Sequence, residues 1–227
     1  MLVRQLFDAD TSTYTYILAD PKSKQAAIID SVKEQVERDV KLLEEMGLTL
    51  KYALETHVHA DHVTGAGDLR DRLGAKVVYH ESSENQCADQ LVKDGEVLKL
   101  GDETITVMHT PGHTSGDTTY KIDGVVFTGD ALLIRGCGRT DFQQGDPGAL
   151  YDSITGKIFT LADDTVIYPG HDYAGRTATT VGEEKAHNPR LGNNKSREDF
   201  IALMNALDLP KPRLIDVAVP GNLRCGQ

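Results

Sequence analysis

The sequence contains no tryptophan and only three cysteines, Cys87, Cys137 and Cys225. No two cysteines are separated by two residues, so the chain has no Cys-x-x-Cys pair and a zinc ribbon is excluded. The three cysteines are odd in number and lie far apart along the chain. This sparse usage, without a signal peptide, predicts reduced thiols rather than a framework of disulfide bonds.

Long hydrophobic runs and a targeting segment are also absent. No apolar run approaches the ~20 residues that a helix needs to cross a bilayer. The N-terminal segment has no basic region followed by an apolar one, and its early Asp8 and Asp10 are atypical of an arginine-rich transit peptide. We therefore expect a soluble, cytoplasmic protein.

Basic charge is scarce as well. The chain has 24 lysine and arginine residues against 35 aspartate and glutamate residues, which gives a net charge of −11. A surface of this sign repels nucleic acid and anionic membranes, so we expect neither as a partner. An anionic substrate would need arginine or lysine side chains placed locally at its binding site.

Hydrophobic residues make up 39% of the 227-residue chain, enough for a packed core. We expect a single domain over residues 1–227, in which 172–227 form a short helical extension. Short strands alternate with helices, and the ligand candidates described below follow strands. This order favours two packed sheets covered by helices, with the ligands along one edge. Strands are predicted at 14–19, 25–29, 51–55, 76–79, 103–109, 118–122, 125–128 and 165–168, helices at 32–46, 65–73, 146–159, 176–186 and 196–207, and an extended segment at 209–213.

Four candidate metal ligands lie close together in the segment His57-Val58-His59-Ala60-Asp61-His62. Residues i and i+2 of an extended segment share one face, so His57 and His59 can converge on one point. A turn at Ala60 can bring Asp61 and His62 back toward the same point, and the glycines that follow permit a close turn. This His-x-His-x-Asp-His motif predicts a metal site.

Three further ligand candidates follow a glycine. His113 and His171 each follow Pro-Gly, and Asp130 follows Thr-Gly. A glycine before a ligand lets the backbone approach a crowded centre. Each of these short motifs is weak alone, but together with the histidine cluster they predict one metal centre built from several loops.

Together these residues resemble the metallo-β-lactamase superfamily, which implies an α/β fold, an αββα sandwich of two mixed β-sheets flanked by helices. With Asp130, where β-lactamases carry a cysteine, the ligand set is similar to the glyoxalase II-like branch. The segments 134–145 and 183–190 resemble the persulfide dioxygenases of that branch. The resemblance extends to at least His171. It implies an oxidoreductase that oxidises glutathione persulfide with O2 to sulfite and glutathione, in sulfide detoxification.

The resemblance further implies one Fe(II) per chain, bound by His57, His113 and Asp130 as a triad of two histidines and one carboxylate. With one carboxylate the site keeps a net charge of about +1, which a sulfur anion of the substrate would neutralise. The remaining candidates would then orient the ligands or move protons, or form a second site without metal. They are His59, Asp61, His62 and His171.

A dinuclear hydroxyacylglutathione hydrolase of the glyoxalase II type is the alternative. Its two metals would be bridged by water and would share Asp130. Every ligand of both metals is present, so the number of ligands does not exclude hydrolysis. Such hydrolases carry a helical C-terminal extension that binds the glutathione thioester, and the stretch after His171 is short for such a domain. Length therefore favours the dioxygenase.

Glutathione persulfide carries two carboxylates, and arginine binds a carboxylate through two parallel hydrogen bonds. Arg139 lies in the segment that resembles the persulfide dioxygenases, and Tyr173 and Arg176 follow His171 closely. We expect these three residues to bind the substrate, with Asp141 orienting Arg139. The sequence leaves the oligomeric state open, and a homodimer is among the states it allows.

Overall fold

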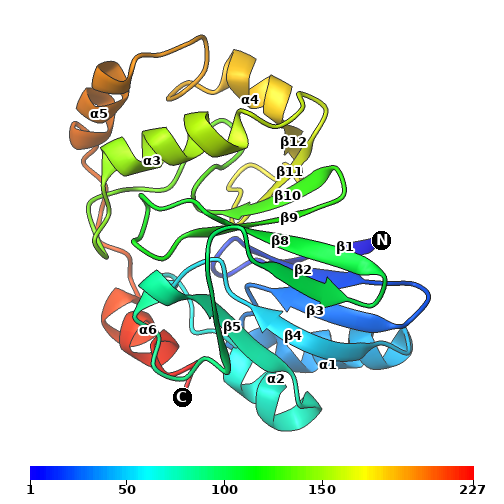
Figure 1. The fold of residues 1–227 in the computed structure, drawn as a ribbon. Helices are drawn as coiled ribbons and strands as arrows, with labels where there is room; N and C mark the ends of the chain where they lie inside the picture. The colour runs from blue at the N-terminus through cyan, green and yellow to red at the C-terminus, as the bar shows by residue number, and fades with distance from the viewer.

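Two six-stranded β-sheets lie face to face in the computed structural model, which describes all residues from Met1 to Gln227 (Figure 1). The first sheet has the order β1-β2-β3-β4-β5-β6 and is antiparallel from β1 to β3 and parallel from β3 to β6. Its strands are β1 (Leu2–Asp8), β2 (Thr13–Ala19), β3 (Gln25–Ile29), β4 (Thr49–Leu54), β5 (Lys76–His80) and β6 (Gln90–Val92).

The second sheet has the order β12-β11-β10-β9-β8-β7. Its neighbouring strands are antiparallel except for β10 and β11, which run parallel. Its strands are β7 (Val97–Leu100), β8 (Glu103–His109), β9 (Thr118–Ile122), β10 (Val125–Gly129), β11 (Val166–Pro169) and β12 (Thr179–Thr180).

The structure has three hydrophobic cores, and alternating side chains of β2 contribute to two of them. In β2, Tyr14, Tyr16 and Leu18 face the second sheet and pack in the core between the sheets. Ile17 and Ala19 face the opposite way and pack under the helices. Successive residues of a strand point to opposite faces, and both faces of β2 are covered. This explains the unbroken burial of β2.

Helices cover the outer face of each sheet (Figure 1). In α1, Val36, Val40 and Leu43 follow helical spacing and pack on the first sheet. The predicted αββα sandwich is therefore confirmed. No helix combines the length and apolar character needed to cross a membrane. The helices are η1 (Lys33–Gln35), α1 (Val36–Glu45), α2 (Ala66–Leu73), η2 (Glu81–Ser83), α3 (Pro147–Ser153), the π-helix η3 (Ile154–Ile158), α4 (Val181–His187), α5 (Arg197–Asn205) and α6 (Ile215–Asn222).

The helix predicted over 176–186 begins only at Val181. The Thr180 side chain accepts a hydrogen bond from the N–H of Glu183, whose carboxylate accepts the N–H of Thr180, and this capping box fixes the start of α4. Upstream, the Asp172 carboxylate accepts the N–H groups of Ala174 and Arg176 and holds a turn instead of a helix. The description of 172–227 as a separate extension stays a prediction.

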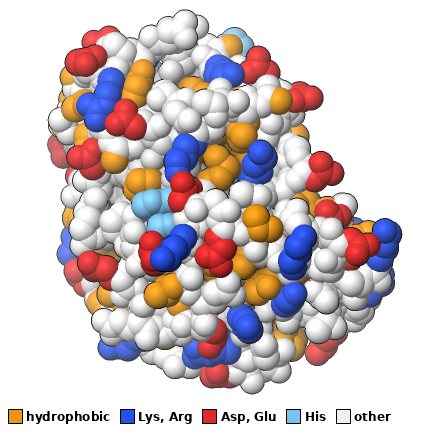
Figure 2. Space-filling view, in the orientation of Figure 1, with side chains coloured by type: hydrophobic (Ala, Val, Ile, Leu, Met, Phe, Trp, Pro, Cys, Tyr) orange, Lys and Arg blue, Asp and Glu red, His pale blue; other side chains and the backbone are white.

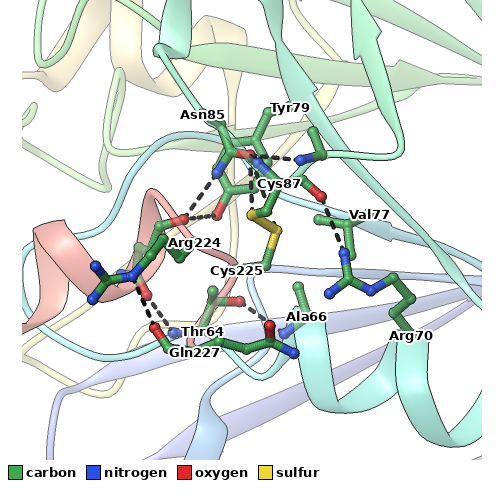
Figure 3. The surroundings of a disulfide bond; sticks show 12 residues. Thr64, Ala66, Arg70, Val77, Tyr79, Asn85, Cys87, Arg224, Cys225 and Gln227 are labelled. Atoms are coloured by element: carbon green, nitrogen blue, oxygen red, sulfur yellow. Dashed lines mark hydrogen bonds between the residues drawn. A yellow bond between two sulfur atoms is a disulfide. The ribbon is translucent and has the colours of Figure 1, made fainter.

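The prediction of reduced thiols is wrong for Cys87 and Cys225, which form a disulfide bond (Figure 3). The two residues are 138 positions apart. They meet because α6, which the sequence analysis did not predict, packs beside the connection from β5 to β6. Spacing along the chain carries no information about such a contact. Cys137 is a free thiol buried in the core beneath α3 and α5.

Removal of the disulfide should lower stability, because the bond restricts the unfolded chain over a long loop. We expect the double variant Cys87→Ser, Cys225→Ser to lose about 2–4 kcal/mol of unfolding free energy. Urea unfolding of both proteins measures the difference. Wild-type protein treated with a reductant should match the variant, and an unchanged unfolding midpoint in both would contradict a stabilising disulfide.

Asp39 should make stability depend on pH. Its side chain is buried on the inner face of α1, and burial raises its pKa from 3.8 to about 6 despite the neighbouring Arg38. The folded state therefore binds this proton more tightly than the unfolded chain does. The carboxyl group thus stabilises the protein below pH 4, and this stabilisation is lost as pH rises to about 6.

The variant Asp39→Asn removes this proton-linked term. Its unfolding free energy relative to wild type should rise by up to about 3 kcal/mol between pH 4 and pH 7. Denaturant unfolding across this range is the measurement. Asp164→Asn, at an exposed carboxylate without an ion pair, serves as the control and should show no such trend. A flat difference for Asp39→Asn would contradict the raised pKa.

Candidate metal centre

Four loops at one edge of the sandwich carry the candidate ligands. The loop after β4, in the first sheet, carries His57. The loops after β8, β10 and β11, in the second sheet, carry His113, Asp130 and His171. The carboxyl ends of these strands meet at this edge, so both sheets contribute ligands to one place.

His57, His113 and Asp130 are close enough to share one ion. Their ligand atoms all lie within 4.8 Å of one another. Nε2 of His113 is 3.7 Å from Oδ2 of Asp130, and the ring centroids of His57 and His113 are 4.9 Å apart with nearly perpendicular planes. Two imidazole nitrogens and one carboxylate oxygen are a ligand set that leaves further positions of a metal open.

A hydrogen bond at the other ring nitrogen orients each of the two imidazoles. His113 donates through Nδ1 to the carbonyl oxygen of Arg139 over 2.7 Å. Nδ1 of His57 lies 3.0 Å from Oγ1 of Thr56, whose own hydrogen goes to the carboxylate of Asp30 over 2.8 Å. The hydroxyl therefore accepts from His57. Both bonds leave the Nε2 lone pair free to bind a metal.

Burial and unpaired atoms test whether these residues fit a metal. Burial, together with the neighbouring His59 and His113, holds the pKa of His57 well below its ordinary value, so the ring is neutral as a metal ligand must be. Oδ1 of Asp130 is buried without a hydrogen-bond partner. A buried, unpaired carboxylate oxygen is costly, and a cation removes that cost. The residues fit a metal ion.

Glycines allow the backbone to reach this crowded centre. A Cβ atom on Gly170 would lie 2.7 Å from Oδ1 of Asp130, and one on Gly138 would lie 2.8 Å from the His113 ring. Neither position has room for a side chain. Gly170 directly precedes His171, which agrees with the role expected for glycines that stand before ligands.

Asp61, His62 and His171 form a second group beside the triad. Oδ2 of Asp61 accepts a hydrogen bond from Nδ1 of His62 over 2.8 Å and lies 3.5 Å from Nε2 of His171. Burial alone would raise the pKa of Asp61, but the two imidazoles hold it well below its ordinary value. Nε2 of His171 lies 3.7 Å from Oδ1 of Asp130, so the two groups adjoin.

Two carboxylates that the sequence analysis missed hold His59. Its Nε2 lies 3.2 Å from Oδ1 of Asp30 and 3.2 Å from Oε2 of Glu55. Burial opposes a charge on His59, but both carboxylates raise its pKa well above the ordinary value. Asp30 directly follows strand β3, as Asp130 follows β10, and this likeness is the signal that could have identified it.

The guanidinium of Arg139, predicted to bind substrate, already has several partners. It donates to both carboxylate oxygens of Asp141 over 2.6 and 2.7 Å, as expected for an orienting residue. It also donates to the carbonyl oxygens of Leu209 and Pro210 and lies 4.6 Å from the ring centroid of Phe142. These contacts fasten the chain between α5 and α6 to the ligand loops.

Tyr173 and Arg176 lie on the loop after β11 and are more open. The Tyr173 ring is stacked with the His171 ring at 5.9 Å, and the residue is 77% exposed. The Arg176 side chain pairs with Asp172 at 2.8 Å and is 45% exposed. On the face shown in Figure 2, acidic and basic side chains are scattered among uncharged ones. This face therefore offers an anionic substrate single basic side chains and no broad basic surface.

Comparison with known proteins places this centre in a family. The Metallo-beta-lactamase superfamily matches residues 9–171. The mitochondrial persulfide dioxygenase ETHE1 of Homo sapiens is 49% identical over 229 residues, which cover 100% of this chain and 89% of the relative. The Bos taurus protein has the same identity and coverage. The hydroxyacylglutathione hydrolase GloC of Haemophilus influenzae is 38% identical over 76% of this chain and 90% of its own length.

A solved structure agrees with the sequence relatives. The crystal structure of ETHE1 from Myxococcus xanthus superposes with a TM-score of 0.98 at 52% identity, and each chain covers 100% of the other. The full-length match includes the segments 134–145 and 183–190, which contain none of the candidate ligands. The chain therefore belongs to the metallo-β-lactamase superfamily and, within it, to the persulfide dioxygenase family.

Proposed function

We propose that the protein is a mononuclear iron(II) persulfide dioxygenase, which converts glutathione persulfide, O2 and water to glutathione and sulfite. The observation that carries this proposal is the set His57, His113 and Asp130, with all ligand atoms within 4.8 Å. Support comes from the mammalian relatives named persulfide dioxygenases, which match the whole chain at 49% identity.

Iron(II) held by this triad would supply open positions for the activation of O2 beside an anionic sulfur. Hydrogen bonds within the chain already orient the two metal-binding histidines. The Arg139 carbonyl and the Thr56 hydroxyl hold His113 and His57 with Nε2 facing inward. Asp130 brings a single negative charge, so the loaded centre would remain attractive to a persulfide anion.

His59, Asp61, His62 and His171 would act without binding metal. Thr13 and His62 donate hydrogen bonds to the carboxylate of Asp61. The carboxylates of Asp30 and Glu55 lie beside Nε2 of His59. Held in this way, the four residues would steady the ligand loop and hold protons near the centre. The dinuclear hydrolase keeps one specific point in its favour, because Nε2 of His62 is buried without a partner.

Substrate carboxylates would be bound mainly from the loop after His171. Arg176 and Tyr173 are exposed there, whereas the donors of Arg139 are shared among Asp141 and two carbonyl groups. We propose that Arg176 pairs with a carboxylate of the thiol carrier and that the Tyr173 hydroxyl hydrogen-bonds beside it. Arg139 would contribute to the substrate site in one of two ways. It would hold the chain between α5 and α6 beside the ligand loops, or it would exchange one of its two carbonyl partners for a substrate carboxylate.

We propose a cytoplasmic location, although the mammalian relatives are named as mitochondrial. We also propose that the protein can form a homodimer.

Metal content and O2 uptake test the proposed reaction. Protein purified without oxygen should hold about one iron per chain and consume O2 when glutathione persulfide is added. Asp130→Ala and His113→Ala should lose both iron and O2 uptake, because each removes one of only three ligands. His187→Ala, at an exposed histidine of α4, is the matched control and should keep both.

The hydrolase alternative gives a different result in the same assays. Two metals per chain, hydrolysis of S-lactoylglutathione and no O2 uptake would favour it. Full iron content and O2 uptake in Asp130→Ala would instead remove Asp130 from the ligand set.

Arg176→Ala should raise KM for glutathione persulfide roughly tenfold with little change in kcat, because carboxylate binding is largely the same in ground and transition states. Steady-state O2 uptake measures both constants. Arg176→Lys should recover part of the loss, and Arg4→Ala, at an exposed arginine of β1, should have no effect. An unchanged KM in Arg176→Ala would exclude this arginine from substrate binding.

A further inference from the structure

The side chain of Asn222, in α6, is fully buried against the loop that carries the His-x-His-x-Asp-His motif. Its Nδ2 donates to the carbonyl oxygens of His59 and His62 over 2.9 and 2.8 Å. Its Oδ1 accepts the N–H of Thr64 over 2.8 Å. One side chain thus binds three backbone groups of the ligand loop.

These three backbone groups have no other hydrogen-bond partner in the structure. The segment from His59 to Thr64 bends sharply and belongs to no helix or strand, and its one bridge, between Val32 and Thr64, leaves these three groups unpaired. A buried backbone group without a partner costs about 1–3 kcal/mol. Asn222 therefore stabilises this particular bend over others that the same residues could adopt.

Only asparagine suits this position. Aspartate lacks the two donors and would place a carboxylate against two carbonyl oxygens. Alanine supplies neither donor nor acceptor, and glutamine is one methylene longer in a fully buried site. The requirement is for two donors and one acceptor at the end of a short side chain.

Several contacts hold the end of α6 in place. The backbone carbonyl oxygen of Asn222 accepts a hydrogen bond from Nδ2 of Asn85 over 2.9 Å. The carbonyl oxygen of Cys225 accepts the N–H of Gly67 over 3.0 Å, and the disulfide ties Cys225 to Cys87 (Figure 3). The end of α6 is thus anchored on the side away from the loop as well.

We propose that Asn222 is a positioning residue of the metal centre, which sets the bend of the loop so that His57 presents Nε2 to the triad. The proposal rests on the proposed function only in placing metal at His57, His113 and Asp130. It concerns binding of the ion and the geometry around it. Its test therefore needs neither O2 nor persulfide.

The experiment compares Asn222→Asp and Asn222→Ala with Asn85→Ala in the full-length, disulfide-intact protein. Asn85→Ala removes one of several anchors of α6 and leaves the three loop contacts intact, while the disulfide and the bond to Gly67 still hold the end of α6. The Kd for Fe(II) is measured anaerobically by competition with a chelator, and the visible spectrum of the Co(II)-substituted protein reports ligand geometry. Circular dichroism confirms that each variant is folded.

Both Asn222 variants should bind Fe(II) about 10- to 100-fold more weakly and should change the Co(II) spectrum, with Asn222→Asp the more severe. Asn85→Ala should keep both properties. Wild-type values in Asn222→Asp, or an equal loss in Asn85→Ala, would overturn the proposal. A failure of persulfide oxidation would leave these measurements unaffected, so the two proposals fail independently.

If neither Asn222 variant folds, hydrogen exchange in the wild-type protein tests the proposal instead. The Thr64 amide, whose only partner is Asn222, should exchange as slowly as the amides of the neighbouring strand β4. Exchange at the rate of an open loop would show that the contact does not persist, and the proposal would fail.

Discussion

The buried carboxylate of Asp30 is the interaction on which the metal centre depends. It accepts hydrogen bonds from the backbone N–H and the hydroxyl of Thr56 over 2.7 and 2.8 Å, and it lies 3.2 Å from Nε2 of His59. Asp30 has a φ of 52°, a left-handed conformation that costs about 1–3 kcal/mol in a residue with a side chain. The pairing of β3 with β4 holds it there, and through Thr56 it orients His57.

The second sheet uses a comparable arrangement for His113. Buried Glu184 of α4 accepts the backbone N–H of Arg135 over 2.9 Å, and Asn188 donates to the carbonyl oxygen of Gly136 over 3.1 Å. These bonds join the segments 134–145 and 183–190, which carried the resemblance to the persulfide dioxygenases. The joined segments present the Arg139 carbonyl to His113. This contact gives a physical reason for the two segments to occur together.

Local patterns in the sequence were enough to predict the sandwich and to find the seven candidate ligands. Helical spacing in α1, alternation in β8 and glycine before Asp130 each depend on near neighbours in the chain. Contacts between residues far apart in the sequence could not be predicted from such local patterns. Asp30, Asn222 and the bond between Cys87 and Cys225 act across such distances, and no short-range signal marks their partners.

The same limit applies to substrate binding. The sequence could select arginines by their position beside ligand motifs, but it could not show which donors were free. Arg139 proved to share its donors among Asp141 and two carbonyl groups, whereas Arg176 kept nearly half of its side chain exposed. The carbonyl groups of Leu209 and Pro210 that compete for Arg139 come from a distant part of the chain, so the sequence could not show that its donors are occupied.

The separation of 160 residues between His62 and Asn222 also sets an order of events during synthesis. The ribosome makes the ligand loop long before it makes the side chain that holds the loop. At about 5–20 residues per second, the delay is roughly 8–30 s. During that interval the ligand loop lacks its hydrogen bonds with Asn222. On the proposed role of Asn222, firm binding of metal would follow the synthesis of α6.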